Sequence, residues 1–258
     1  MIPSDDEKTI PLEDIDVSEL GLSGSVDRPE LFLGHLKESE VKEILLRLGL
    51  FREIEARGYK DWILSIETES LADNRIHVYS ADHQDLFFLR LKLGDYPVTG
   101  PEPIRLVSID WFLTQNIRSK GENLFPGQKH PGLGSQILFI FKNMVREFVE
   151  CSHASGTITV PEYFHDAILF TRFMECRFVN PEKAADFENL RHLGNIRAVS
   201  AAIHGERVQE RKTGKTYHWR HGEMVSLKGE ALNRTLFSRD YEKKYRKTLE
   251  PGKYLLLP

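Results

Sequence analysis

Apolar residues recur every three or four positions along residues 135–151, with Ile137, Phe141, Met144 and Phe148 at the centre of the stripe. Lysine, arginine and glutamate fall on the other side. This period predicts one amphipathic helix with a single buried face. A turn rich in glycine and proline, residues 124–134, leads directly into it. We therefore take this turn and helix as the centre of the chain's organisation.

Upstream of this helix the hydrophobic period changes to two, which is the spacing of a half-buried strand. The alternation occurs in four segments: residues 62–67, 75–80, 87–93 and 104–113. Short loops separate these segments, so neighbouring strands are expected to be antiparallel. Residues 37–58 show a helical pattern that Gly49 interrupts and Gly58 ends, which predicts two short helices.

Downstream of the central helix, the β-branched residues 157–160 predict a further strand. Residues 166–176 then predict a helix, and residues 177–179 another strand. The predicted fold class is therefore α/β (α+β), with a mixed, largely antiparallel central sheet flanked by helices.

The composition shifts from residue 201 onward. Residues 207–211 and 216–219 flank a bend with Gly214, which predicts a hairpin. The apolar residues 254–257 are expected to dock on the body of the protein. Residues 201–258 are thus expected to form a C-terminal hairpin and helix extension packed on the main domain.

The turn before the central helix has the chemistry of an anion site. The first turn of a helix carries backbone N–H groups without partners inside the helix, and its dipole adds positive charge. Gly132 and Gly134 let an anion approach the backbone, and Lys129 adds a full charge. These features are typical of a phosphate or pyrophosphate site. The alternative is a Gly-Pro turn that only starts a helix.

The same turn resembles the loop V-x-P-x-x-[RQ]-x-x-G-x-[GA] of the GNAT superfamily of N-acetyltransferases. The chain has Leu124, Pro126, Lys129, Gly132 and Gly134 at the five defined places. Leucine for valine and lysine for arginine or glutamine are mild departures. The order of predicted elements over residues 31–179 is also the family's order, and it indicates a GNAT-like domain over residues 31–200.

The resemblance implies binding of acetyl-CoA or another acyl-CoA as co-substrate, and transfer of the acyl group to an amine of a small molecule or peptide. The residues implied to hold the coenzyme are Leu124, Lys129, His130, Gly132, Leu133, Gly134 and Ser135. Pro131 departs more sharply from the pattern, because proline has no N–H to offer a pyrophosphate.

Two further departures keep a non-catalytic alternative open. Many relatives have a tyrosine in the helix after the fifth strand, whose hydroxyl returns a proton to the thiolate of coenzyme A. Phe173 stands at that place and cannot donate. The family also runs its fourth strand directly into the loop, whereas residues 114–123 intervene here. A GNAT-fold binding or scaffold protein is therefore the competing interpretation.

An amine is mostly protonated at neutral pH, so acyl transfer requires a general base. Asp110 late in the fourth strand, Glu162 just past the fifth, and His165 are the candidates. Each carboxylate also fits an ordinary surface position, and His165 also fits a helix cap. Spacing does not rank the three.

The balance of charge varies along the chain, although the net charge is only −4. Residues 1–30 hold nine acidic and two basic residues, which predicts an acidic arm. Residues 206–247 hold 12 basic and 6 acidic residues, with tyrosine and tryptophan among them. Such a mixture can hold single-stranded nucleic acid or an anionic partner. We favour a solvated basic face, because the overall charge is negative.

The remaining chemistry is sparse. His218 and His221 resemble a metal pair, but residues 217–221 read as a strand, which would place the two side chains on opposite faces, and no metal site is predicted. Cys151 and Cys176 are expected to be buried thiols of a reducing compartment. Neither a signal peptide nor a membrane span is apparent. We expect a cytoplasmic protein without a membrane partner.

Overall fold

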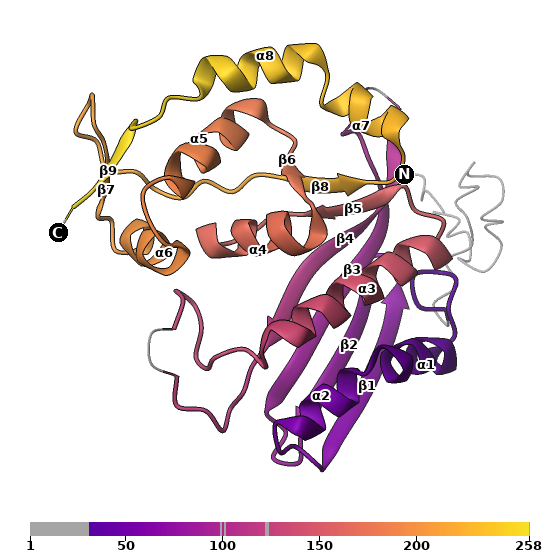
Figure 1. Cartoon of the computed structure of the whole chain (residues 1–258). Helices are drawn as coiled ribbons and strands as arrows, with labels where there is room; N and C mark the ends of the chain where they lie inside the picture. Colours follow the sequence, from indigo (N-terminus) through magenta and orange to yellow (C-terminus); the bar gives the residue numbers. More distant parts are fainter. Residues whose placement is uncertain (1–30, 99, 101, 122–123, 258) are drawn as a thin grey trace, which may run out of the picture.

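A computed structural model describes residues 31–257 of the chain, apart from residues 99, 101, 122 and 123. A seven-stranded mixed sheet with the strand order β1-β2-β3-β4-β5-β8-β6 forms its centre. Helices flank this sheet, and a separate two-stranded sheet joins β7 to β9 (Figure 1). The predicted α/β class with a largely antiparallel sheet is confirmed. The expected acidic arm, residues 1–30, lies outside the described residues.

The elements follow one another in an order that begins with two helices and four strands. These are α1 Glu38–Leu48, α2 Leu50–Ala56, β1 Trp62–Ser70, β2 Asp73–Ser80, β3 Asp85–Tyr96 and β4 Ile104–Thr114. The middle of the chain forms α3 Ser135–Cys151, β5 Gly156–Thr159, α4 Phe164–Met174, β6 Arg177–Phe178, α5 Pro181–Arg191 and α6 Ile196–His204. The remainder forms β7 Val208–Glu210, β8 Met224–Leu227, α7 Glu230–Leu236, α8 Arg239–Thr248 and β9 Tyr254–Leu256.

Strands β1 to β4 form an antiparallel meander, as the short loops predict. β4 and β5 are parallel, because α3 carries the chain back across the sheet between them. β8 pairs antiparallel with both β5 and β6. The C-terminal part of the chain therefore supplies an internal strand of the central sheet.

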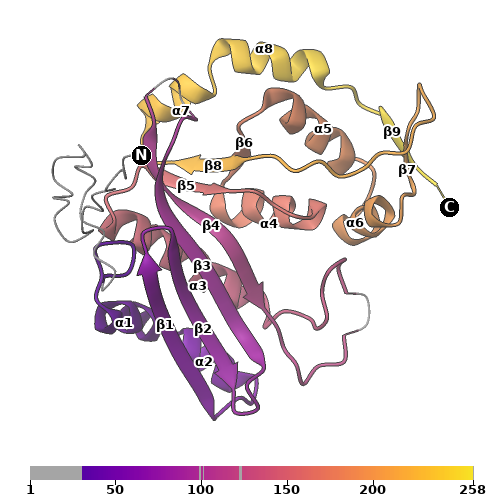
Figure 2. The ribbon, with the colours of Figure 1, turned by 180° about the vertical axis from the view of Figure 1, so that it is seen from behind.

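One face of the meander is buried and the other is bare. Figure 1 shows α1, α2 and α3 in front of β1–β4, and Figure 2, seen from behind, shows these strands without a covering helix. Ile76 and Leu91 alternate with Arg75 and Lys92, so the apolar residues face the helices and the charged ones face outward. The apolar and polar positions that alternate in the sequence therefore lie on the buried and the uncovered face of the sheet, respectively.

Helix α3 has the bounds that its hydrophobic period predicts. Ile137, Phe141 and Phe148 are buried, and the Phe141 ring stacks on that of Phe112 in β4, with ring centroids 3.9 Å apart. Helix α3 packs against α1, α2 and β4, which precede it in the sequence, and against α4, which follows it. It therefore connects the N-terminal and middle parts of the chain within the core.

The structure corrects several expectations. Helix α4 begins at Phe164 rather than at residue 166, because Tyr163 and Asp166 form its capping box. Residues 217–221 are not a strand. The hairpin bend at Gly214 is present with an isolated bridge between Gln209 and Thr216, but β7 pairs mainly with β9.

The C-terminal end docks as expected, since Tyr254 in β9 is buried. Cys176 is a buried free thiol, whereas Cys151 is only half-buried, which corrects the expectation for that residue. Within the described part of the chain, every helix is too short or too polar to cross a membrane.

Candidate functional site

The neighbouring strands β4 and β5 separate at one end. They pair over only three positions, Val107–Ile109 with Thr157–Thr159. The Thr159 hydroxyl donates to the Ile109 carbonyl at 3.0 Å, and β4 then continues to Thr114 without a described strand on that side. Beyond Ile109, β4 therefore has no strand partner on the β5 side among the described residues.

A bulge lies where the strands begin to separate. Arg90 pairs with Trp111 and Leu91 with Ile109, so Asp110 is the extra residue of β4. Beyond the bulge, Phe112 faces α3, whereas the exposed Trp111 does not belong to the core. The bulge thus marks the point at which β4 stops serving as an internal strand of the sheet.

Helix α3 begins beside this opening. Its N-cap is Gly134, with φ of 108°, and no side chain caps the first turn. The Arg57 guanidinium, at the C-terminal end of α2, lies against Gly134 and makes no ion pair with a described residue. A helix N-terminus and a guanidinium repel one another unless an anion lies between them. This arrangement therefore suits a phosphate.

The structure brings only part of the predicted coenzyme loop to this helix start. Gly134 and Ser135 are at the N-terminus of α3, and Gly132 packs beside Thr114 at the end of β4. Leu133 is buried, and its N–H donates to the Thr114 hydroxyl at 3.3 Å. That amide is therefore engaged inside the protein.

The remaining three loop residues lie earlier in the turn. Lys129 is exposed and forms no ion pair within the described part of the chain, whereas Leu124 and His130 are half-buried. Pro131 lacks an N–H, and its backbone carbonyl accepts a hydrogen bond from the backbone N–H of Asn116 at 2.6 Å. Of these residues, only Lys129 offers an exposed charge to an anion.

The first residues of the loop lie beside α4 and α6. The Phe125 ring stacks on the imidazole of His165, with centroids 4.5 Å apart, and the Arg197 guanidinium lies 5.1 Å from the Phe125 centroid. Gly127 lies against the Tyr163 ring. The loop thus joins the end of β4 to the N-terminal end of α4, across the place where the two strands part.

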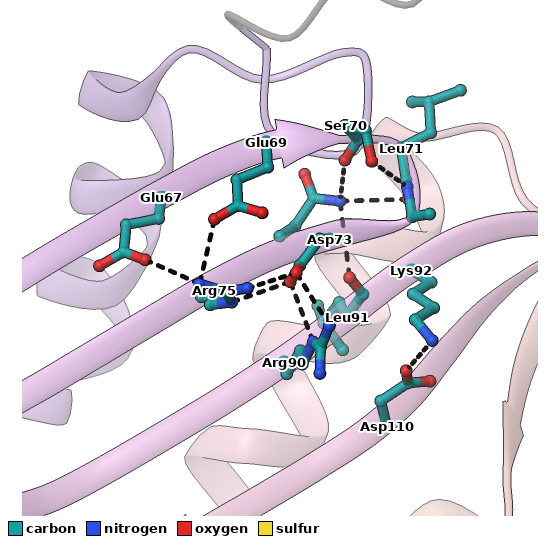
Figure 3. A network of polar contacts seen from close by, with 12 residues as sticks. Glu67, Glu69, Ser70, Leu71, Asp73, Arg75, Arg90, Leu91, Lys92 and Asp110 are labelled. Carbon is teal, nitrogen blue, oxygen red and sulfur yellow. Dashed lines mark hydrogen bonds and ion pairs between the residues drawn. The ribbon is translucent and has the colours of Figure 1, made fainter.

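Asp110 lies on the bare face of the sheet. Its carboxylate accepts from the Ser108 hydroxyl at 2.7 Å and pairs with Lys92, with 2.5 Å between Oδ2 and Nζ. Figure 3 shows this pair beside a second network in which Arg75 and Arg90 both contact Asp73. Asp110 is therefore a carboxylate already neutralised by a neighbouring cation.

His165 is buried, with 3% of its surface exposed. Its Nδ1 lies 2.9 Å from the Ser200 hydroxyl and its Nε2 3.3 Å from Asp166. Burial lowers the pKa of the imidazole to about 4, so the ring is neutral and weakly basic at pH 7. The alternative role as a helix cap does not apply, because His165 lies inside α4 and Asp166 caps this helix by accepting from the Tyr163 N–H.

Glu162 lies between β5 and α4 and lines a cavity of about 260 Å³. Its carboxylate makes no ion pair within the described residues. His218 and His221 line the same cavity, although a strand would have placed them on opposite faces. The described residues contain no cluster of ligands that could hold a metal ion. Glu162 and Asp110 are both exposed, but of these two carboxylates only Glu162 is without an ion pair among the described residues.

Sequence reasoning missed three residues at this site, namely Arg57, Tyr163 and Ser200. Arg57 and Ser200 reach it from α2 and α6, and no local pattern marks either of them. Tyr163 has its pKa raised by burial and then by the Glu162 carboxylate, so it stays a protonated phenol at neutral pH. Phe173 packs edge to face on Phe139, at 5.4 Å between centroids.

Two tyrosines of the basic C-terminal region are not available for stacking on a nucleic acid. Tyr217 and Tyr241 are buried, and the Tyr241 hydroxyl donates to the Phe178 carbonyl at 2.7 Å. Base stacking on a single strand requires exposed rings. These two rings therefore serve the core, whereas Trp219 and Tyr245 are half-buried.

Comparison with known proteins does not identify a family for this chain. No protein family model matches the chain, and no curated protein matches it either.

Proposed function

We propose that this chain is a GNAT-like acyltransferase that moves an acetyl or other acyl group from acyl-CoA to an amine. The observation that carries the proposal is the parting of the parallel strands β4 and β5 after Ile109 and Thr159, with α3 beginning beside the opening. This is where the resemblance implies that coenzyme and acceptor meet. The element order from α1 to β6 supports the same assignment.

The pyrophosphate of the coenzyme binds at the N-terminus of α3 in this proposal. The unpaired N–H groups of the first turn, the Arg57 guanidinium and the exposed Lys129 supply the positive charge. Pro131 and Leu133 contribute no free N–H, so the helix start and Arg57 carry more of the binding than the loop does. The amides of the pantetheine arm then pair with the open backbone of β4 beyond Ile109.

Transfer forms a C–N bond and breaks the C–S bond of the thioester. Glu162 takes the proton from the ammonium of the acceptor, because its carboxylate is accessible and has no cationic partner among the described residues. Asp110 is paired with Lys92, and His165 is buried and weakly basic. Tyr163 is the phenol beside Glu162 that can protonate the departing thiolate, a role that Phe173 cannot fill, and the second proton that the nitrogen loses as the amide forms then restores the phenol.

The second candidate is a GNAT-fold protein that binds acyl-CoA without turnover. Phe173, the proline at 131 and the engaged Leu133 amide favour it. Binding and turnover therefore have to be measured separately.

Calorimetry with CoA, acetyl-CoA and longer acyl-CoAs tests binding, and release of free thiol in the presence of an amine panel tests turnover. A Cβ on Gly132 would meet the Thr114 methyl at 3.5 Å, an ordinary contact, so Gly132→Ala keeps the fold and Gly132→Leu adds bulk between the loop and Thr114 at the end of β4. We expect Gly132→Leu to lose CoA binding with an unchanged melting temperature. Binding without turnover supports the scaffold reading, and no binding of any CoA overturns both.

A further inference from the structure

The cavity beside Glu162 has a composition that the proposed coenzyme site does not explain. It lies between the N-terminal end of α4, α6 and residues 218–221, elements that Figure 1 shows at the end of the sheet away from α7. Its volume of about 260 Å³ admits a small organic molecule. Its lining combines carboxylates, aromatic rings and imidazoles.

Apart from three imidazoles, the ionisable lining groups include two carboxylates and no lysine or arginine. Glu162 and Glu206 line the cavity, and neither lysine nor arginine is among the described lining residues. Glu162 has no ion-pair partner in the described residues, and Glu206 has only His218, at 3.7 Å between Oε1 and Nδ1. Two carboxylates around one cavity whose described lining contains no lysine or arginine favour a positively charged occupant.

Aromatic rings supply the second type of contact for a cation. Trp219 and Tyr163 line the cavity. The Trp219 indole donates to the Pro161 carbonyl at 3.3 Å and packs edge to face on Phe164, so its ring is held in place. The same indole already binds one ammonium, since Lys183 Nζ lies 3.5 Å from its centroid. The π face of tryptophan is the strongest cation binder among side chains.

A hydrogen-bonding group lies among the buried lining residues. Ser200 is 2% exposed, lines the cavity, and has its hydroxyl 2.9 Å from His165 Nδ1. A hydroxyl has one donor and two acceptor sites, so Ser200 keeps capacity for a ligand N–H after bonding to His165. An ammonium in this cavity would therefore meet carboxylate, ring and hydroxyl together.

We propose that this cavity binds a small organic cation, a primary amine in its ammonium form or a compact quaternary ammonium. Binding of the cation itself does not need the coenzyme. Identifying a bound primary amine as the acyl acceptor does rest on the proposed function, because Glu162 would then be both the carboxylate that recognises the ammonium and the base that deprotonates it.

The test compares cations with neutral molecules of the same shape. Choline is paired with 3,3-dimethyl-1-butanol, and butylamine with butanol, with butyrate as the anion. Binding is followed on the full chain by calorimetry and by quenching of tryptophan fluorescence, without CoA. We expect saturable binding of the cations and none of the neutral or anionic probes at equal concentration.

Isosteric variants locate the site. Glu162→Gln removes the charge and keeps the shape, and should weaken cation binding by about threefold to tenfold, as a partly exposed charge pair does. Glu223→Gln removes an exposed carboxylate that lies just after the lining segment 218–221 but does not itself line the cavity. This variant should bind the cations as the parent protein does. Equal loss in both variants, or equal binding of choline and its neutral analogue, overturns the proposal.

The same variants separate this proposal from the proposed enzymatic function. Gly132→Leu should bind choline normally while it loses CoA. If cations bind and no acyl-CoA is turned over, the cavity stands and the acyltransferase assignment falls. If acyl transfer occurs while cations fail to bind at this cavity, the cavity proposal is wrong and the acceptor binds elsewhere.

Discussion

The guanidinium of Arg57 lies directly against the backbone of Gly134. A Cβ built at Gly134 would come within 2.6 Å of Arg57 Nη2, so a larger residue would displace the end of this side chain from the start of α3. Two residues 77 positions apart thereby combine a full positive charge with the positive end of a helix dipole. The proposed phosphate site depends on this contact.

Replacing Arg57 by alanine should weaken CoA binding by about threefold to tenfold, since one partly exposed charge-assisted contact to phosphate is lost. Arg52→Ala is the matched control, because Arg52 is an exposed arginine of the same helix that lies near Gly49 instead. Calorimetry at two salt concentrations measures both. An equal effect in the two variants would mean that only the general charge of α2 matters.

Gly134→Ala should lower the free energy of unfolding by about 1–3 kcal/mol, because the new side chain must adopt a strained backbone conformation. The φ of Gly134 is 108°, and Arg57 must also move away. Urea unfolding at pH 7 measures the change. Gly132→Ala has neither problem, and a similar loss of stability in that variant would contradict the explanation.

Stability should fall as the pH is lowered from about 6.5 to about 4, because His165 is neutral when folded and protonated when unfolded. The unfolded chain binds the extra proton across this window, so the loss is at most on the order of 3 kcal/mol. Asp166, with its pKa raised by burial to about 6, opposes this trend below pH 6. Its side chain is 31% exposed, which reduces its effect.

The His165→Asn variant isolates this contribution, because asparagine can keep a hydrogen bond to Ser200 without titrating. Urea midpoints measured every half pH unit should decline less steeply in the variant than in the parent. Parallel curves for the two proteins would show that His165 is not the buried neutral group that the structure indicates.

Glu162 and Asp110 should differ sharply in catalysis. Glu162→Gln should lower the turnover number by about a hundredfold or more, as loss of a general base does. Asp110→Asn should change it by less than about fivefold, because that carboxylate is already bound to Lys92 and Ser108. Steady-state rates of thiol release measure both. A larger loss of turnover in Asp110→Asn than in Glu162→Gln would indicate that Asp110, on the uncovered face of the sheet, is the general base.

Local hydrophobic period predicted the first two thirds of the fold well. The four strands of the meander and α3 have long, clean patterns, and α3 has the bounds that its stripe predicts. The elements of residues 181–258 were harder to predict from local patterns. β8 has only four residues and receives its place from β5 and β6, which are distant in the sequence. Helix α5 has no clear apolar stripe, because it packs on both α6 and α8.

The candidate site was predictable only where its residues are consecutive. Gly134 and Ser135 lie at the helix start, as the turn suggested. Arg57 and Ser200 approach from remote helices, and His218 and His221 share a cavity because their segment is irregular rather than extended. Contacts of this kind depend on tertiary packing, which a single-sequence pattern does not contain.

The position of β8 has a consequence for biosynthesis. β5 and β6 have no described strand between them until residues 224–227 leave the ribosome, so the central layer stays split while every other strand of this sheet is already made. A nonsense mutation between Phe178 and Met224 would leave β6 without the one neighbour it has among the described strands and would expose an open edge of β5. Such a shortened product would be a substrate for chaperones and proteases rather than a smaller working domain.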